Sequence, residues 1–504
     1  MASSMATMVV PFPQTLKSQA RSFLSQPPNT VMKLKPKHTK ALKTYPTNVT
    51  CSATLSSSLE TIEKQEEGKK QKEVAEVWRK IHGEDNWAGL LDPLDPLMRT
   101  ELIRYGEMAQ ACYDAFDYDP YSKYCGSCRF SIPEFFQSLD MPNVGYNVTR
   151  YLYATANINL PKFFRKSRWP DKKWSQHANW SGFIAVSDDA TSKRLGRRDI
   201  TIAWRGTVTN VEWVADLTNF LRPIAPLIPS PDEGIKVEAG FLDLYTDKEQ
   251  ECGYCKYSAR EQVLGEVKRL MKIYADEEVS ITITGHSLGS AMAILSGFDV
   301  VESGASVGKS GRKAHVSVFS FSGPRVGNAK FKERLEGELG IKVLRVHNRH
   351  DLVPQSPGFL FNEGLAPWLV KLVDWLPWCY LHVGQELELD HKQSPFLNPN
   401  GDAACAHNLE AHLHLLDGYH RKYDPFKRTS ERDIALVNKS CDFLKDEYTV
   451  PPNWRQDLNK NMMKTEGGRW MFTDRQVSQD PHHQDIDPHL EELGLFSSDK
   501  STNK

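Results

Sequence analysis

One stretch of the chain, residues 279–296, constrains its fold more than any other. Residues 279–284 read Val-Ser-Ile-Thr-Ile-Thr, a short β-branched run that is typical of a buried strand. The sequence GHSLG follows at residues 285–289 and matches G-x-S-x-G. Small and apolar residues at 290–296 then predict a helix. A strand, a sharp turn and a helix in this order are the setting of a nucleophile elbow.

Ser287 is the serine of this elbow, and we expect it to be a nucleophile. Gly285 and Gly289 have no side chain that could collide with the turn or with its neighbours. The turn would hold the hydroxyl at the N-terminus of the helix, where amide groups and the helix dipole favour a developing negative charge. The alternative is a chance G-x-S-x-G in a loop, and the flanking strand and helix argue against it.

A serine hydroxyl is a poor nucleophile until a base takes its proton, and an acid must orient that base. In α/β-hydrolases the acid and then the histidine follow the serine along the chain. Asp351 comes just after a strand predicted over residues 342–346, so we expect it at the same edge of the sheet as the elbow. The alternative for Asp351 is a turn residue before Pro354.

We expect His407 to be the base. It lies after a small-residue loop, at the first turn of a helix predicted over residues 407–417. A loop or helix start lets a histidine reach both the acid and the nucleophile. His414 and His412 are the alternatives in the same predicted helix, and His414 would lie deeper as a packing residue.

The oxyanion formed by attack on an ester needs two hydrogen-bond donors. Leu288 supplies one backbone N–H, because it follows the nucleophile. Thr207 closes an Arg-Gly-Thr loop after a strand predicted over residues 199–204, and it could offer a backbone N–H and a hydroxyl. Acyl transfer of this kind requires no metal or organic cofactor.

Composition excludes several classes of protein. The chain carries 63 basic and 64 acidic side chains, a net charge of −1, so nothing argues for nucleic-acid binding. No run of 18 apolar residues predicts a spanning helix, so we expect any contact with lipid to be peripheral. The C-x-x-C pairs at 125–128 and 252–255 lack a zinc-ribbon or thioredoxin-like setting, which favours structural cysteines and no metal.

Charge is unevenly spread along the chain. Residues 1–59 hold seven Lys or Arg, no Asp or Glu and no continuous apolar segment, which indicates an organelle transit peptide. The alternative is a basic tail that is not cleaved. The expected order is a chloroplast transit peptide (1–51), a charged linker and docking helix (59–90), an α/β-hydrolase domain (91–425), a C-terminal extension packed on the core (426–470) and a disordered tail (471–504).

Together these motifs resemble the class 3 lipase family. The matching segments are IAWRGT (202–207), EWVADL (212–217), GFL (240–242), GHSLG (285–289), GPRVGN (323–328) and Asp351. Within the family the chain is most similar to the plant chloroplastic class-I phospholipases A1 of the gamma type. That similarity lies in RYGEMAQ (104–110), YLYAT (151–155) and VPPNWRQ (450–456). Ser290 departs from the glycine that is more common after GHSLG, and serine is small enough for that position.

The resemblance covers about residues 75–470. It implies an α/β-hydrolase core, in which helices cover a mainly parallel sheet, and a plastid location. It also implies hydrolysis of the sn-1 acyl ester of glycerolipids at a membrane surface. Family substrates include phosphatidylcholine, galactolipids and triacylglycerol.

The family carries a lid after its Arg-Gly-Thr strand, which places a lid on residues 208–221 of this chain. Trp213, Val214, Leu217 and Phe220 could cover an acyl groove and contact lipid when the lid opens. An ordinary core helix would explain the same spacing.

Two other functions are compatible with the fold. A lipase-like signalling or interaction protein of weak activity should lack a member of the Ser-Asp-His set or the oxyanion loop, and this chain retains candidates for all of them. An esterase of small soluble acyl esters would have no need of a lid.

Overall fold

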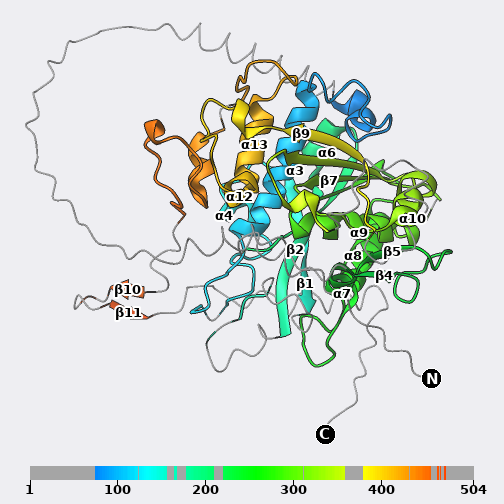
Figure 1. Cartoon of the computed structure of the whole chain (residues 1–504). Helices are drawn as coiled ribbons and strands as arrows, with labels where there is room; N and C mark the ends of the chain where they lie inside the picture. The colour runs from blue at the N-terminus through cyan, green and yellow to red at the C-terminus, as the bar shows by residue number, and fades with distance from the viewer. Residues whose placement is uncertain are drawn as a thin grey trace, which may run out of the picture. The chain divides into compact units, whose positions relative to one another are not determined.

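The computed structural model of the chain divides into two units, residues 1–62 and 63–504, and the description below concerns the second. Figure 1 carries the element labels used below. The described residues are 74–122, 124–155, 164–166, 168, 177–208, 220–309, 311–357, 379–430, 432–455, 462–464, 466 and 470–472. The expected transit peptide lies outside them.

A sheet of seven strands forms the centre of the second unit, in the order β1-β2-β3-β6-β7-β8-β9. The strands are β1 (Tyr146–Thr155), β2 (Ala178–Ser187), β3 (Arg198–Trp204), β6 (Val279–His286), β7 (His315–Phe321), β8 (Lys342–Asn348) and β9 (Gln385–Leu389). The pairs β1–β2 and β2–β3 are antiparallel, and the four pairs from β3 to β9 are parallel. The carboxyl ends of β3, β6, β7 and β8 therefore meet at one edge of the sheet.

The other elements are short strands and helices. Two antiparallel pairs join β4 (Leu221–Pro223) to β5 (Lys236–Glu238) and β10 (Met462–Lys464) to β11 (Trp470–Phe472). The α-helices are α3 (Pro96–Asp114), α4 (Phe135–Ser138), α6 (Asp189–Leu195), α7 (Ala239–Thr246), α8 (Ala259–Ile273), α9 (Leu288–Glu302), α10 (Ala329–Glu333), α12 (Ala403–Ala406) and α13 (Leu409–Gly418).

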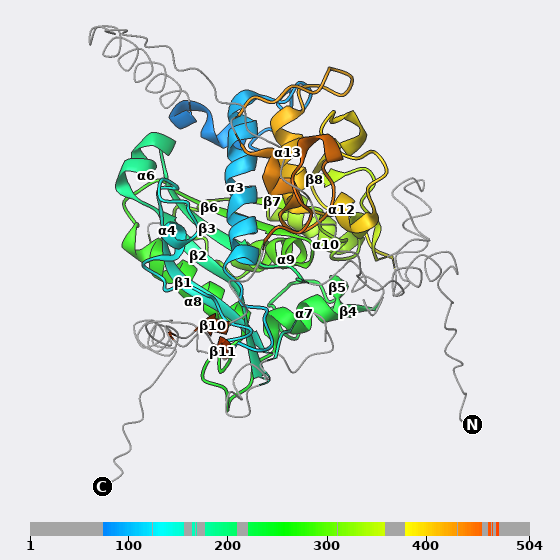
Figure 2. The ribbon, with the colours of Figure 1, turned by 90° about the vertical axis from the view of Figure 1, so that its left-hand side faces the viewer.

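Helices cover both faces of the sheet. On one face Tyr105 of α3 and Leu413 of α13 join Phe319 of β7 in one buried cluster. On the other face Leu295 of α9 joins Val318 in a second cluster, because successive strand residues point to opposite faces. Figure 2 shows α3 lying across the strands beside α13. The α/β-hydrolase core, with a mainly parallel sheet between helices, is confirmed.

The predicted strands at 199–204, 279–284 and 342–346 are confirmed as β3, β6 and β8. Most of the predicted lid falls on residues 209–219, which lie outside the described part of the chain. Among the described residues, no helix is long and apolar enough to cross a membrane.

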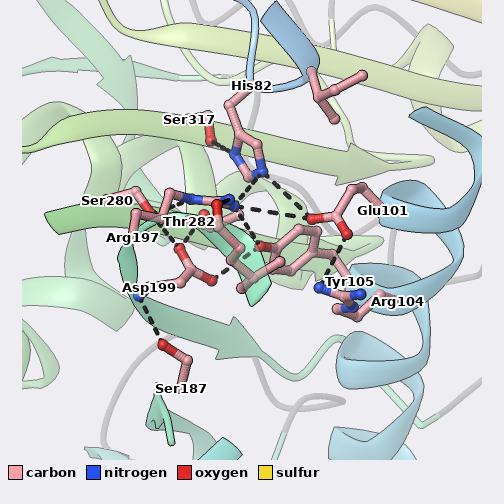
Figure 3. Close-up of polar contacts among 12 residues, drawn as sticks. His82, Glu101, Arg104, Tyr105, Ser187, Arg197, Asp199, Ser280, Thr282 and Ser317 are labelled. Carbon is pink, nitrogen blue, oxygen red and sulfur yellow. Dashed lines mark hydrogen bonds and ion pairs between the residues drawn. The ribbon is translucent and has the colours of Figure 1, made fainter. Parts of the chain in front are cut away.

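A buried polar network lies where β3, β6 and β7 begin, at the edge of the sheet opposite the elbow (Figure 3). Asp199, which is fully buried, accepts hydrogen bonds of 2.6–2.9 Å from five hydroxyl groups. These belong to Tyr105, Tyr146, Thr201, Ser280 and Thr282. Burial alone would raise the pKa of Asp199, but the positive charge of Arg197 and the hydroxyl donors lower it. The carboxylate is therefore ionised in the interior.

His82 joins this network to the segment before α3. Arg197 Nη2 donates to His82 Nε2 at 2.7 Å, so His82 Nδ1 carries the proton and donates to Ser317 Oγ at 2.9 Å. Burial, with the charge of Arg197, lowers the pKa of His82 to about 4, and the ring is neutral at pH 7. Burial would raise the pKa of Glu101 on α3, but the positive charges of Arg104 and Arg197 lower it to about 2.

Asp199→Asn should lower the free energy of unfolding by about 3–5 kcal/mol, because it leaves buried hydroxyl donors and Arg197 without their acceptor charge. Urea unfolding at pH 7 measures this loss. The control is Asp189→Asn. Asp189 pairs with Arg198 at 2.7 Å, but its side chain is 96% exposed. Its loss should cost less than about 1 kcal/mol.

The cost of Asp199→Asn should also shrink in acid. The pKa of Asp199 is lowered in the folded protein, so its stabilisation is complete above the unfolded-state pKa, about 3.9 for Asp. That stabilisation is lost as the pH falls through the folded-state pKa. A cost that stays constant from pH 7 to pH 3 would contradict this account.

Candidate active site

Ser287 occupies a strained turn between β6 and α9, with φ 61° and ψ −129°. A positive φ is uncommon outside glycine and costs of order 1–3 kcal/mol. The amide of Ser287 donates to the carbonyl oxygen of Phe321 at 2.9 Å, so the end of β7 holds the turn in place. Ser287 thereby lies at the N-cap of α9.

Two glycines let neighbouring backbone approach this serine. A Cβ at Gly289 would collide with the carbonyl oxygen of Trp204. A Cβ at Gly206 would collide with the hydroxyl of Tyr113 and lie 3.2 Å from Ser287 Cβ. The Arg-Gly-Thr loop after β3 therefore lies directly against the elbow.

Ser290 supports the same turn from the first turn of α9. Its hydroxyl lies 2.6 Å from the carbonyl oxygen of Gly285 and 2.9 Å from that of Phe321. Ser290 thus binds the ends of both β6 and β7.

Asp351 and His407 form a buried pair. His407 Nδ1 donates to Asp351 Oδ2 at 2.7 Å, and the amide of Val353 donates to Asp351 Oδ1 at 2.9 Å. Burial would raise the pKa of Asp351, but the charge interaction and hydrogen bond with His407 lower it. Nε2 of His407 and Oγ of Ser287 are both buried, and neither has a hydrogen-bond partner among the described residues.

His286, the second residue of GHSLG, fixes the backbone at His407. Its Nε2 donates to the carbonyl oxygen of His407 at 2.8 Å, and the hydroxyl of Tyr113 donates to its Nδ1 at 2.8 Å. Burial lowers the pKa of His286 well below its usual value, and the neighbouring histidines lower it further. Sequence reasoning gave no role to His286 and did not find its contact with Tyr113. Tyr113 precedes His286 by 173 positions and belongs to no recognised catalytic motif.

The alternative histidines are engaged elsewhere. His412 Nδ1 donates to the carbonyl oxygen of Asn408 at 2.7 Å, and His412 Nε2 lies 2.6 Å from Ser322 Oγ. Burial lowers its pKa to about 4. His414 Nε2 lies 2.9 Å from Ser394 Oγ. Of the three histidines, His407 is the one hydrogen-bonded to Asp351.

One structural detail of the sequence prediction was wrong. His407 was expected in the first turn of a helix over 407–417, but it is the C-cap of α12, and Asn408 is the N-cap of α13. A new helix begins at Asn408 because its side chain accepts a hydrogen bond from the amide of Glu410 at 3.0 Å. His407 therefore lies between two helices, where its ring can turn toward Asp351.

A pocket of about 400 Å³, here called the His407 pocket, opens beside this pair and is lined by Thr207, His286 and His407 among other residues. Leu288 is the first residue of α9, next to the strained serine. The structure thus brings the two expected oxyanion donors to the loop and the helix end that flank Ser287.

Of the expected lid residues, Phe220 is 54% exposed, and Trp213, Val214 and Leu217 lie outside the described residues.

In the described part of the chain, one group of side chains could hold a metal ion. His350, Asp390 and His391 offer ligand atoms within 4.8 Å of one another. Cys125, Cys128, Cys252 and Cys255 are buried and form no disulfide among the described residues. Neither C-x-x-C pair belongs to that group.

A serine on a strained strand-to-helix turn and a buried His-Asp pair at the carboxyl edge of a parallel sheet are the arrangement expected of a serine hydrolase with the α/β-hydrolase fold. Residues 201–361 match the family described as Lipase (class 3). The chain belongs to the class 3 lipase family.

Three relatives place it within that family. It is 59% identical to "Phospholipase A1-Igamma1, chloroplastic" of Arabidopsis thaliana, over 85% of this chain and 84% of that protein. It is 58% identical to "Phospholipase A1-Igamma2, chloroplastic" of the same plant, over 84% and 81%. It is 40% identical to "Phospholipase A1-II 6" of Oryza sativa subsp. japonica, over 81% and 97%.

Gly206→Ala should lower kcat for a soluble nitrophenyl ester about 100-fold without unfolding the protein, because its Cβ displaces the loop that carries Thr207. Initial rates and thermal melting measure the two effects. The control is Gly337→Ala, where a Cβ would have no atom within 4 Å. Equal activity of the two variants would show that the loop has no such constraint.

Proposed function

We propose that the protein is a lipid acyl hydrolase of the phospholipase A1 type. It cleaves the sn-1 acyl ester of glycerolipids such as phosphatidylcholine and galactolipids, with triacylglycerol as a further substrate. The observation that carries the proposal is the 2.7 Å hydrogen bond between His407 and Asp351 beside the strained Ser287. The relatives at 59% and 58% identity are named phospholipases A1, which supports a lipid substrate.

The proposed reaction begins when Ser287 Oγ attacks the ester carbonyl carbon while His407 Nε2 takes its proton. Asp351 orients the imidazole and stabilises its positive charge. The amide of Leu288 and the donors of Thr207 would bind the oxyanion, and loss of one such donor costs about 3–4 kcal/mol of barrier.

The tetrahedral intermediate then collapses, and the bond to the glycerol oxygen breaks. His407 returns its proton to that oxygen, so the lysolipid leaves as an alcohol and the acyl group remains on Ser287. Water attacks the acyl-enzyme with His407 again as the base, and a free fatty acid is released.

We also propose that the protein works in the plastid after removal of residues 1–51. The absence of acidic residues from 1–59 and the chloroplastic names of its relatives support this location. A lid formed by Trp213, Val214, Leu217 and Phe220 would meet the membrane surface.

Ser287→Ala should lower kcat on phosphatidylcholine liposomes by at least about 1,000-fold. Asp351→Asn should lower it about 1,000- to 10,000-fold, because the histidine loses its orienting acceptor. Liposomes with different sn-1 and sn-2 chains, read by mass spectrometry of the released acids, also test position. Equal release of both chains would remove the A1 assignment. No release by the folded parent protein would favour a lipase-like interaction protein.

If the lid contacts lipid, activity should rise sharply when a short-chain phospholipid passes from monomers to micelles. An esterase of small soluble esters would show no such rise. Phe220→Ala should lower the micellar rate about three- to tenfold, because a phenyl ring is lost from the lipid contact, and should leave the monomer rate unchanged. The matched control is Tyr423→Ala, which removes an 88% exposed aromatic ring that has no expected lid role.

A further inference from the structure

The His407 pocket has a wall that the proposed reaction does not yet use. It is formed by residues of the C-terminal extension, among them Lys439, Asn453 and Arg455. The end of α3 supplies Gln110 and Tyr113 on another side. Part of this wall is the VPPNWRQ segment, to which the catalytic motifs give no role.

The pocket carries an excess of positive charge. Apart from histidines, Lys439 and Arg455 are the charged side chains among its described lining residues. Both bind one carboxylate behind the wall, since Lys439 Nζ lies 2.6 Å from Asp114 Oδ2 and Arg455 Nη1 lies 3.1 Å from Asp114 Oδ1. Two cations on one anion leave a net charge of +1.

The acids near this wall do not line the pocket in the described part of the chain. Glu410, which is buried, forms an ion pair with Arg432. Arg432 also lies 3.3 Å from Glu107, whose side chain is 41% exposed. The side chains of Lys439 and Arg455 are each 17% exposed, so screening by water is reduced at the pocket wall.

The chemistry of ester cleavage indicates which part of a lipid would lie in the His407 pocket. His407 must return its proton to the departing glycerol oxygen, so the glycerol and its head group lie on the His407 side of the ester. Amide, hydroxyl and cationic side chains on the wall suit a polar head group better than an acyl chain.

We propose that the His407 pocket is a head-group subsite in which Lys439 and Arg455 bind the phosphodiester of a phospholipid. Asp114 holds the two cations in place and limits their charge. The pocket therefore favours phospholipids over galactolipids, whose sugar head groups carry no phosphate. This proposal rests on the proposed function.

The test compares kcat/KM for phosphatidylcholine and monogalactosyl diacylglycerol with the same acyl chains, each in neutral mixed micelles. Neither substrate has a net charge, so the ratio reports the phosphate contact and not general attraction to a charged surface. Lys439→Met should lower the phospholipid-to-galactolipid ratio about three- to tenfold, with the galactolipid rate unchanged. Lys439→Arg should restore the ratio.

Two further variants sharpen the test. Asp114→Asn should raise the ratio, because it removes the negative charge that the two cations share. Lys445→Met is the matched control. Lys445 lies on the same extension and donates to the carbonyl oxygen of Pro395 at 2.5 Å, away from the described pocket lining. The effect of Lys439→Met should weaken at high salt.

An equal loss of kcat/KM for both lipids in Lys439→Met would overturn the head-group subsite while the hydrolase assignment stands. So would a failure of Lys439→Arg to restore the ratio of the two kcat/KM values. No hydrolysis of either lipid by the parent would overturn the proposed function itself. Circular dichroism establishes folding for each variant. If Asp114→Asn does not fold, the comparison of Lys439→Met with Lys439→Arg still tests the head-group subsite.

Discussion

The strained backbone of Ser287 is the constraint on which the proposed site depends. A serine at φ 61° persists only where its surroundings hold it, and here they do so from several strands. The carbonyl oxygen of Phe321, at the end of β7, accepts a hydrogen bond from the Ser287 amide and another from the Ser290 hydroxyl. Backbone after β3 lies so close that a Cβ at Gly289 would collide with it. The elbow therefore requires the whole parallel edge to be formed and in register.

The stability for that edge comes from the opposite end of the same strands. Asp199 collects five hydroxyl donors there, two of them from β6. A buried charge that loses its partners is costly, so this network favours one register of β3 against β6. A one-residue slip would turn every side chain to the other face of the sheet and would take Gly285 out of the turn. The buried network and the strained serine thus lie at opposite ends of the same strands, and both depend on one register of β3 against β6.

Sequence reasoning reached the elbow and Asp351 because both follow directly from a strand and its loop, which are local patterns. It ranked His407 first without excluding His412 and His414, since the break between α12 and α13 depends on the capping role of Asn408. It could not find Tyr113, His82 or the wall at Lys439. Those contacts join segments far apart in the sequence, such as Lys439 and Asp114, which are 325 positions apart, and no local spacing encodes them. Fold class was accessible from strand and helix periods, whereas the shape of the pocket required tertiary packing.

The histidines next to His407 are neutral for a physical reason. Burial keeps the pKa of His286 well below its usual value and lowers that of His412 to about 4, so both rings are neutral at pH 7. Asp351 stays ionised, because its interaction with His407 outweighs its burial. A proton taken by His407 would therefore meet one carboxylate and two uncharged rings. The neutral ring of His286 lies with its centroid 4.5 Å from that of His407, so it can position the proposed base without opposing the charge that the reaction creates.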